Sequence, residues 1–177
     1  MANISEKKCL ELLKKYATDN NIFNIVLEHV NAVQKVALRI ASQCKNVDIG
    51  FIKTASLLHD IGRFKTGKGK KGINHGIIGA EIVRKEGLDE RYALVCERHI
   101  GAGITKEDIQ NNNLGLPIKD YLPMSNEEKI IAHADNLIFG NKEGTLQMVI
   151  DRFRKELGNK YVDRVKELAH DVENLKK

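Results

Sequence analysis

The sequence predicts an all-α protein, a bundle of about seven to eight helices. In most segments apolar residues recur at intervals of three and four, the period of an α-helix. The chain has only two prolines and no tryptophan, and alternating runs are so scarce that no strand is needed. A length of 177 residues with 42% hydrophobic residues fits one domain, 1–177, with a substantial core.

Composition also indicates where the protein works. The first sixteen residues are charged and amphipathic, without the apolar stretch of a signal peptide, and no segment approaches the roughly 20 apolar residues that span a bilayer. We therefore expect a cytoplasmic protein. Cys9, Cys44 and Cys96 are odd in number and far apart, so they are interpreted as reduced core thiols and not as zinc ligands or disulfides.

The first helix is expected to begin after Ser5 as N-cap and to end near Tyr16. The second is expected over about 24–44, with a valine-rich stripe on its buried face and His29 at the edge of that face. A single histidine in such a place is more often a core residue than a ligand. Asp48 is a suitable N-cap for the third helix.

The third helix leads into Leu-Leu-His-Asp-Ile-Gly-Arg at 57–63, an apolar run that ends in two adjacent metal-capable side chains. His59 is expected to point into the protein, and Asp60 to lie in the last helical turn, where the macrodipole disfavours a carboxylate. A buried, unpaired Asp60 would be strongly destabilising, whereas a cation would pair with it and accept the imidazole lone pair. The alternative is a salt-bridged aspartate beside a core histidine. Gly62 is expected to end the helix in a left-handed conformation.

A basic segment follows, since residues 63–71 contain no acidic residue. It carries Arg63, Lys65, Lys68, Lys70 and Lys71, interleaved with glycines. We expect a mobile loop, which either attracts a polyanionic substrate and closes over it or is only a solvated basic tip.

Two further histidines lie at predicted helix ends. His75 lies in the first turn of the fourth helix, about 74–87, where the dipole disfavours protonation and leaves a neutral imidazole available as a ligand. The fifth helix, capped by Asp89, brings His99 to its end before Gly101, a placement that repeats that of His59.

The rest of the chain begins with a long connection, 102–124, which is expected to hold a short helix near Thr105 and could form a pocket wall. Ser125 and Glu128 form a capping-box pattern for a sixth helix, on which Asp135 shares an apolar face. The last helices, about 145–157 and 159–175, are expected to cover the core or a homodimer partner.

Together these side chains form an ordered set. The set comprises His29, His59 with Asp60, His75, His99 and Asp135. Its order resembles the pattern of the HD superfamily of metal-dependent phosphohydrolases, and His-Asp-Ile-Gly at 59–62 resembles the HDIG variant. The likeness covers about 24–140, which leaves 1–23 and 141–177 as helical extensions.

The resemblance implies a dinuclear metal site. One ion would be held by His29, His59, Asp60 and Asp135, and a second would share Asp60 and add His75 and His99. This ligand set suits Mn, Fe, Co, Ni or Zn, and no organic cofactor is needed. Two ions bridged by Asp60 would activate water against a phosphate ester or anhydride, with a nucleotide as the expected substrate. Arg63 would stabilise charge on the phosphate.

The sequence also departs from relatives and leaves alternatives open. Arg98 precedes His99, where several dinuclear relatives carry paired histidines, and the Gly-Tyr-Pro signature of cyclic dinucleotide phosphodiesterases is absent, so cyclic dinucleotides are poor substrate candidates. A di-iron oxygenase could use the same ligands. A nucleic-acid-binding module could use the basic segment, although stacking aromatics are scarce, with five Phe and four Tyr.

Overall fold

The computed structural model describes residues 3–66 and 69–176, without the side chains of residues 69–71. Helices dominate this part of the chain, and the predicted all-α class is confirmed. The elements are α1 (Glu6–Tyr16), α2 (Asn20–Ala41), α3 (Ile49–Leu58), the 3-10 helices η1 (Ile61–Lys65) and η2 (Gly69–Asn74), α4 (His75–Lys85), α5 (Glu90–Arg98), α6 (Lys106–Asn112), α7 (Asn126–Asn136), β1 (Ile138–Phe139), β2 (Lys142–Glu143), α8 (Leu146–Glu156) and α9 (Asn159–Leu175).

Side-chain caps set most helix starts. The caps predicted at Ser5, Asp48, Asp89 and Ser125 each accept a hydrogen bond from a backbone N–H of the first turn. Helix α2 begins four residues earlier than predicted, because Asp19 caps it through the N–H of Ile22 at 2.8 Å.

The capping box predicted for α7 is only half formed. Ser125 accepts from the N–H of Glu128 at 3.2 Å, but the Glu128 carboxylate turns to the N–H of Met124 and to Arg98 and does not return to Ser125. That carboxylate therefore ties the start of α7 to the end of α5.

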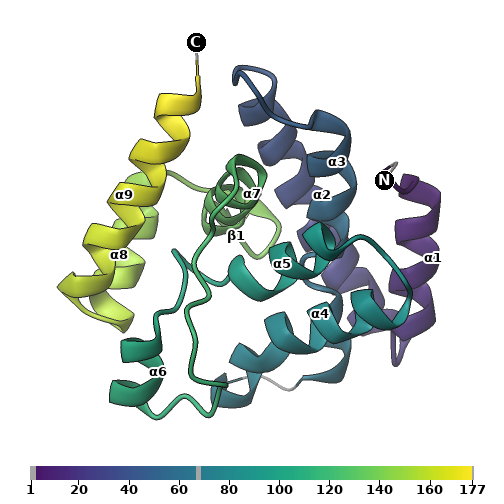
Figure 1. Cartoon of the computed structure of the whole chain (residues 1–177), viewed down its shortest axis with the longest axis horizontal. Helices are drawn as coiled ribbons and strands as arrows, with labels where there is room; N and C mark the ends of the chain where they lie inside the picture. The colour runs from purple at the N-terminus through teal and green to yellow at the C-terminus, as the bar shows by residue number, and fades with distance from the viewer. Residues whose placement is uncertain (1–2, 67–68, 177) are drawn as a thin grey trace.

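The helices share one large apolar core, to which α1 to α5 and α7 to α9 contribute buried side chains. Helix α2 packs along α3 and α7, and α4 packs against α5 (Figure 1). Helices α8 and α9 lie side by side on the opposite side of the molecule from α1 (Figure 1). The predicted core thiols Cys9, Cys44 and Cys96 are buried and unpaired. Burial raises the pKa of Cys9 to about 12, which keeps it a protonated, inert thiol.

One small sheet departs from the expectation that no strand is needed. Strands β1 and β2 form a two-residue antiparallel pair after α7, joined by a turn in which Gly140 has φ of +70°. Four paired residues are too few to produce a period-two pattern in the sequence. The turn is still important, because it brings the carbonyl of Gly140 to His29 on α2.

The helices of the described part are too short or too polar to serve as membrane-spanning segments.

Candidate metal centre

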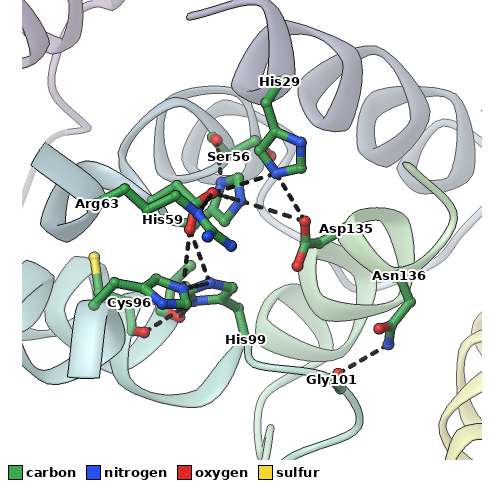
Figure 2. Close-up of polar contacts among 12 residues, drawn as sticks. His29, Ser56, His59, Arg63, Cys96, His99, Gly101, Asp135 and Asn136 are labelled. Atoms are coloured by element: carbon green, nitrogen blue, oxygen red, sulfur yellow. Dashed lines mark hydrogen bonds and ion pairs between the residues drawn. The ribbon is translucent and has the colours of Figure 1, made fainter. Parts of the chain in front are cut away.

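All six residues of the ordered set meet between the helices. Helix α2 supplies His29, the α3–η1 junction supplies His59 and Asp60, and α7 supplies Asp135 in its last turn. His75 is the first residue of α4, and His99 caps the C-terminus of α5. Figure 2 shows His29, His99 and Asp135 pointing toward one another from three separate helices. Five chain segments thus converge on one point.

The α3–η1 junction differs from its predicted form. Helix α3 ends at Leu58, His59 is its C-cap, and Asp60 is the N-cap residue of η1, so Asp60 is not in the last turn of the α-helix. Gly62 lies within η1 and does not have a positive φ, so the predicted left-handed conformation is wrong. Glycine is required there for packing, because a Cβ would lie 2.0 Å from the carbonyl oxygen of His75. Helix η1 therefore rests directly on α4, which brings Asp60 against His75.

Backbone carbonyls orient all four imidazole rings. Each Nδ1 lies within hydrogen-bond distance of a carbonyl oxygen: 2.7 Å for His59 and Ser56, 2.5 Å for His75 and Gly72, 2.9 Å for His99 and Cys96, and 3.0 Å for His29 and Gly140. A carbonyl can only accept, so each Nδ1 must carry the proton. In the neutral ring, Nε2 then presents a lone pair, and the four Nε2 atoms all lie within 4 Å of the Asp60 carboxylate.

The two carboxylate oxygens of Asp60 face two different sets of ligands. Oδ1 lies 3.1 Å from Nε2 of His75 and 3.2 Å from Nε2 of His99. Oδ2 lies 3.3 Å from Nε2 of His29 and 3.8 Å from Nε2 of His59. One fully buried carboxylate is therefore shared between two pairs of histidines.

Asp135 completes the first of these sets. Its Oδ1 lies 3.0 Å from Nε2 of His29 and 3.7 Å from Nε2 of His59. The ligand atoms of His29, His59 and Asp135 lie within 4.8 Å of one another, as do those of His59, Asp60 and His99.

These contacts fit bound cations better than hydrogen bonds. Nε2 of His75 lies 2.9 Å from Nε2 of His99, and two lone pairs cannot bond to each other. With all four rings neutral and Nδ1 protonated, Nε2 of His29, Nε2 of His59 and Oδ1 of Asp60 are buried without a hydrogen-bond partner. Each such atom costs about 1–3 kcal/mol. Ligand atoms at about 2.0–2.1 Å from one ion lie about 3.0–3.4 Å apart, close to the separations seen here. The donor set therefore fits divalent metals.

The electrostatics favour ionised carboxylates. Burial alone would raise the pKa of Asp60, but His59, His75 and His99 outweigh it and hold that pKa well below its ordinary value. His29 and His59 outweigh burial in the same way for the pKa of Asp135. Both side chains are thus anionic at neutral pH, as metal ligands must be.

Two histidines differ in their protonation. Burial lowers the pKa of His99 to about 4, which keeps its ring neutral. For His29, burial favours the neutral ring, but the carboxylates of Asp135 and Asp60 outweigh it and raise the pKa to about 9 in the metal-free protein. A cation that binds at His29 must therefore displace a proton.

A cavity of about 830 Å³, here called the main cavity, opens from this cluster. Its lining includes His29, His75, His99 and Asp135 of the cluster together with residues of α6, α8 and α9. Its wall includes 102–104 and Leu114, so the predicted role of the 102–124 connection as a pocket wall is confirmed. A second hollow of about 520 Å³ reaches His29, Asp60 and Arg63 from the side of Ile25 and Gly140.

The residues predicted to bind substrate fall into three groups. Arg63 donates from Nε to Oδ2 of Asp60 and lines both hollows. Lys65 places Nζ 5.3 Å from the ring centre of Tyr16, against α1. Lys68 and the side chains of Lys70 and Lys71 lie outside the described residues.

Sequence reasoning missed the part of the cavity wall that α6, α8 and α9 supply. Asp108, Asn112, Arg152, Tyr161 and Arg164 belong to it. Nothing in the local sequence marks them, because helices far apart in the chain bring them together.

Comparison with known proteins supports the site. The model of the HD domain family matches residues 26–140. An uncharacterised protein of Methanocaldococcus jannaschii, MJ0778, is 47% identical over 177 residues, which are 97% of this chain and 98% of that protein.

Two longer relatives are named tRNA (cytidine(56)-2'-O)-methyltransferases. That of Thermoplasma volcanium is 44% identical over 85% of this chain and 41% of its own length. That of Picrophilus torridus is 40% identical over 96% of this chain and 47% of its own length. The chain thus spans less than half of either protein.

Among solved structures, the HD domain of the L. monocytogenes phosphodiesterase PgpH has a TM-score of 0.54 at 15% identity, covering 94% of this chain and 96% of that domain. The structure of the same domain in complex with cyclic-di-AMP has a TM-score of 0.54 at 14% identity, covering 94% of this chain and 95% of that domain. At such identities the likeness concerns the fold. Residues 26–140, which the HD domain model matches, carry all six side chains of the cluster, and by this match the chain belongs to the HD domain family.

Proposed function

We propose that this protein is a metal-dependent phosphohydrolase that cleaves a phosphate ester or anhydride, with a nucleotide as substrate. The observation that carries the proposal is the Asp60 carboxylate, whose two oxygens face two separate sets of imidazole lone pairs. Divalent cations bound there would lower the pKa of a water molecule and polarise a phosphoryl group.

Asp60 and Arg63 act as a unit in this proposal. Asp60 accepts from Nε of Arg63, which fixes the plane of the guanidinium and leaves its terminal nitrogens for other acceptors. Arg63 lines the main cavity beside the cluster, and in Figure 2 its terminal nitrogens extend toward the ligands. Arg63 can therefore donate to phosphoryl oxygens as negative charge develops on them.

The main cavity suits a nucleotide. A volume of about 830 Å³ lies within the range of small-molecule sites. Ile104, Leu114 and Phe153 supply apolar wall for a base, and Tyr161 adds an aromatic ring with a hydroxyl group. Lys65, Lys68, Lys70 and Lys71 are proposed to attract the phosphate to the opening, in a chain whose net charge is +5.

A phosphate carried by RNA is a second candidate substrate. Sequences 44% and 40% identical to this chain occur within two proteins named as tRNA methyltransferases. Steep loss of binding to RNA with rising salt concentration would be its signature.

The test is release of phosphate or alcohol by protein loaded separately with manganese, iron, cobalt, nickel or zinc. Substrates should cover nucleotides, a simple phosphate monoester, a simple diester and RNA carrying terminal phosphates. Asp60→Asn should abolish turnover, whereas His170→Gln, at an exposed histidine on α9, should leave it unchanged. Iron-dependent consumption of dioxygen without hydrolysis of any substrate would contradict the proposal and favour an oxygenase.

A further inference from the structure

The wall of the main cavity holds an arginine in a constrained position. Arg152, on α8, donates from Nη2 to the carbonyl oxygen of Asn136 at 3.2 Å. Its guanidinium carbon lies 4.7 Å from the ring centre of Phe139 and 5.4 Å from that of Phe153. Two aromatic rings and one carbonyl therefore hold the group in place at the cavity wall. Little conformational entropy remains to be lost when a ligand binds it.

Arg152 differs from the other arginines of the cavity in its charge balance. Arg63 pairs with Asp60, and Arg164 pairs with Asp108 at 2.6 Å. Within the described residues, no carboxylate oxygen lies within 4.0 Å of a nitrogen of Arg152, not even that of Glu156 one turn further along α8. A guanidinium has five N–H donors, and here a carbonyl occupies one. Its positive charge and remaining donors are therefore available to an anion.

Among the described residues, no hydrogen bond or ion pair joins Arg152 to a side chain of the metal-ligand cluster. Arg152 contacts the backbone of Asn136, the residue after Asp135, and not the Asp135 carboxylate itself. Arg63 already occupies the position next to Asp60. A substrate whose reacting phosphate lies at the cluster would thus need another anionic group to use Arg152.

We propose that Arg152 binds a second phosphate group of the substrate, so that the preferred substrates are nucleotides phosphorylated at two positions. The proposal rests on the proposed function, because it takes the reacting phosphate to lie at the metal ligands. The planar fork of a guanidinium matches two phosphate oxygens, whereas a neutral or singly phosphorylated compound leaves Arg152 unused. Arg152 lies outside the stretch matched by the HD family, so this preference belongs to the C-terminal helices of this chain.

The experiment compares adenosine 3',5'-bisphosphate with adenosine 5'-monophosphate as probes. Calorimetry at low temperature measures binding of each to the metal-loaded protein, and phosphate release is followed in parallel. Wild type should bind the bisphosphate about tenfold or more tightly than the monophosphate. A pair of hydrogen bonds between a guanidinium and a phosphate contributes a difference in affinity of that size. Arg152→Gln should remove most of this preference and leave binding of the monophosphate within about twofold.

Arg154→Gln is the matched control. Arg154 lies on the same helix, is 49% exposed, pairs with Asp151 and does not line the cavity. It should retain the wild-type preference. Arg152→Lys keeps a positive charge over the aromatic rings but loses the planar guanidinium, so it should give an intermediate preference. This variant also tests the proposal if Arg152→Gln folds poorly.

Equal weakening of both probes by Arg152→Gln, or a wild type without preference, would overturn the assignment of Arg152. A binding preference that depends on Arg152, without phosphate release from either probe, would support the assignment of Arg152 but contradict the proposed phosphohydrolase activity.

Discussion

At the scale of single residues, local backbone geometry orients most of the proposed metal ligands. His59, His75 and His99 each direct Nδ1 to a carbonyl three residues earlier, at Ser56, Gly72 and Cys96. The orientation of each of these rings is therefore fixed by the backbone turn that carries the histidine. His29 depends instead on Gly140, 111 residues away. This difference explains why three histidines stood out at predicted helix ends, whereas His29 looked like a core residue until the whole set was considered.

The closest backbone packing at the site gives a residue-scale prediction. In Gly62→Ala the new Cβ would meet the His75 carbonyl at 2.0 Å and the Gly79 nitrogen at 2.6 Å, so η1 must move away from α4. We expect a loss of about 3 kcal/mol or more in the free energy of unfolding, together with reduced metal content. Urea titration and metal analysis measure the two effects.

Gly87→Ala is the control for Gly62→Ala. Gly87 has φ of +69° but open space around its Cα, so alanine should cost about 1 kcal/mol of backbone strain and leave metal content unchanged. A Gly62→Ala protein as stable and as metal-rich as the Gly87→Ala protein would contradict the packing account.

At the scale of elements, α6 shows how far sequence reasoning reaches. Thr105 predicted its start, and the structure closes a full capping box between Thr105 and Asp108. The docking of α6 could not be predicted, because Asp108 pairs with Lys160 and Arg164, 52 and 56 residues away on α9. Long-range ion pairs leave no local pattern. The same limit hid Arg152 and Tyr161, which reach the cavity only because α9 packs against α7 and α8 packs against α9.

Asp108 makes the docking of α6 dependent on pH. Burial raises the pKa of its carboxyl, but hydrogen bonds from Arg164 and Thr105 outweigh burial and hold that pKa below its ordinary value. A carboxyl whose pKa is lower in the folded protein than in the unfolded chain stabilises the fold at pH values above its pKa in the unfolded chain, about 3.9. This stabilisation is lost as the pH falls toward the pKa of the carboxyl in the folded protein.

Asp108→Asn should therefore lower the free energy of unfolding by about 1–3 kcal/mol at neutral pH, since it strands Arg164. The difference from wild type should shrink as pH falls below about 4. Urea titrations at the two pH values measure it, with Asp151→Asn, at an exposed pair, as a control expected within about 0.5 kcal/mol of wild type. A difference that does not change with pH would show that the charge of Asp108 is not what anchors α6.

At the scale of the whole molecule, the metal centre joins segments that the sequence places far apart. The helical period and the family resemblance predicted the fold class and singled out the six side chains that the structure brings together, since each of these signals lies within a single segment. The mutual placement of α2, α4, α5 and α7 depends on core packing that no single segment encodes.

Because the proposed ligands come from five segments, bound metal should stabilise the entire fold. At a free metal concentration of about 100 times Kd, binding adds about 2.7 kcal/mol to the free energy of unfolding. For a chain of 177 residues this raises the Tm by about 5–10 °C. Thermal melts before and after removal of metal with a chelator, and after its return, measure the effect. Asp60→Asn should show no such rise, and a wild-type Tm indifferent to metal would contradict a site that links these helices.

The most direct test of the dinuclear centre is metal content per chain, measured by elemental analysis of purified, metal-loaded variants. The shared Asp60 carboxylate predicts about two ions for wild type, about one for His75→Ala or His99→Ala, and none for Asp60→Asn. His133→Gln, at a histidine of α7 outside the ligand set, should retain both ions. Metal content that is the same in wild type, His99→Ala and Asp60→Asn would contradict the two-metal assignment.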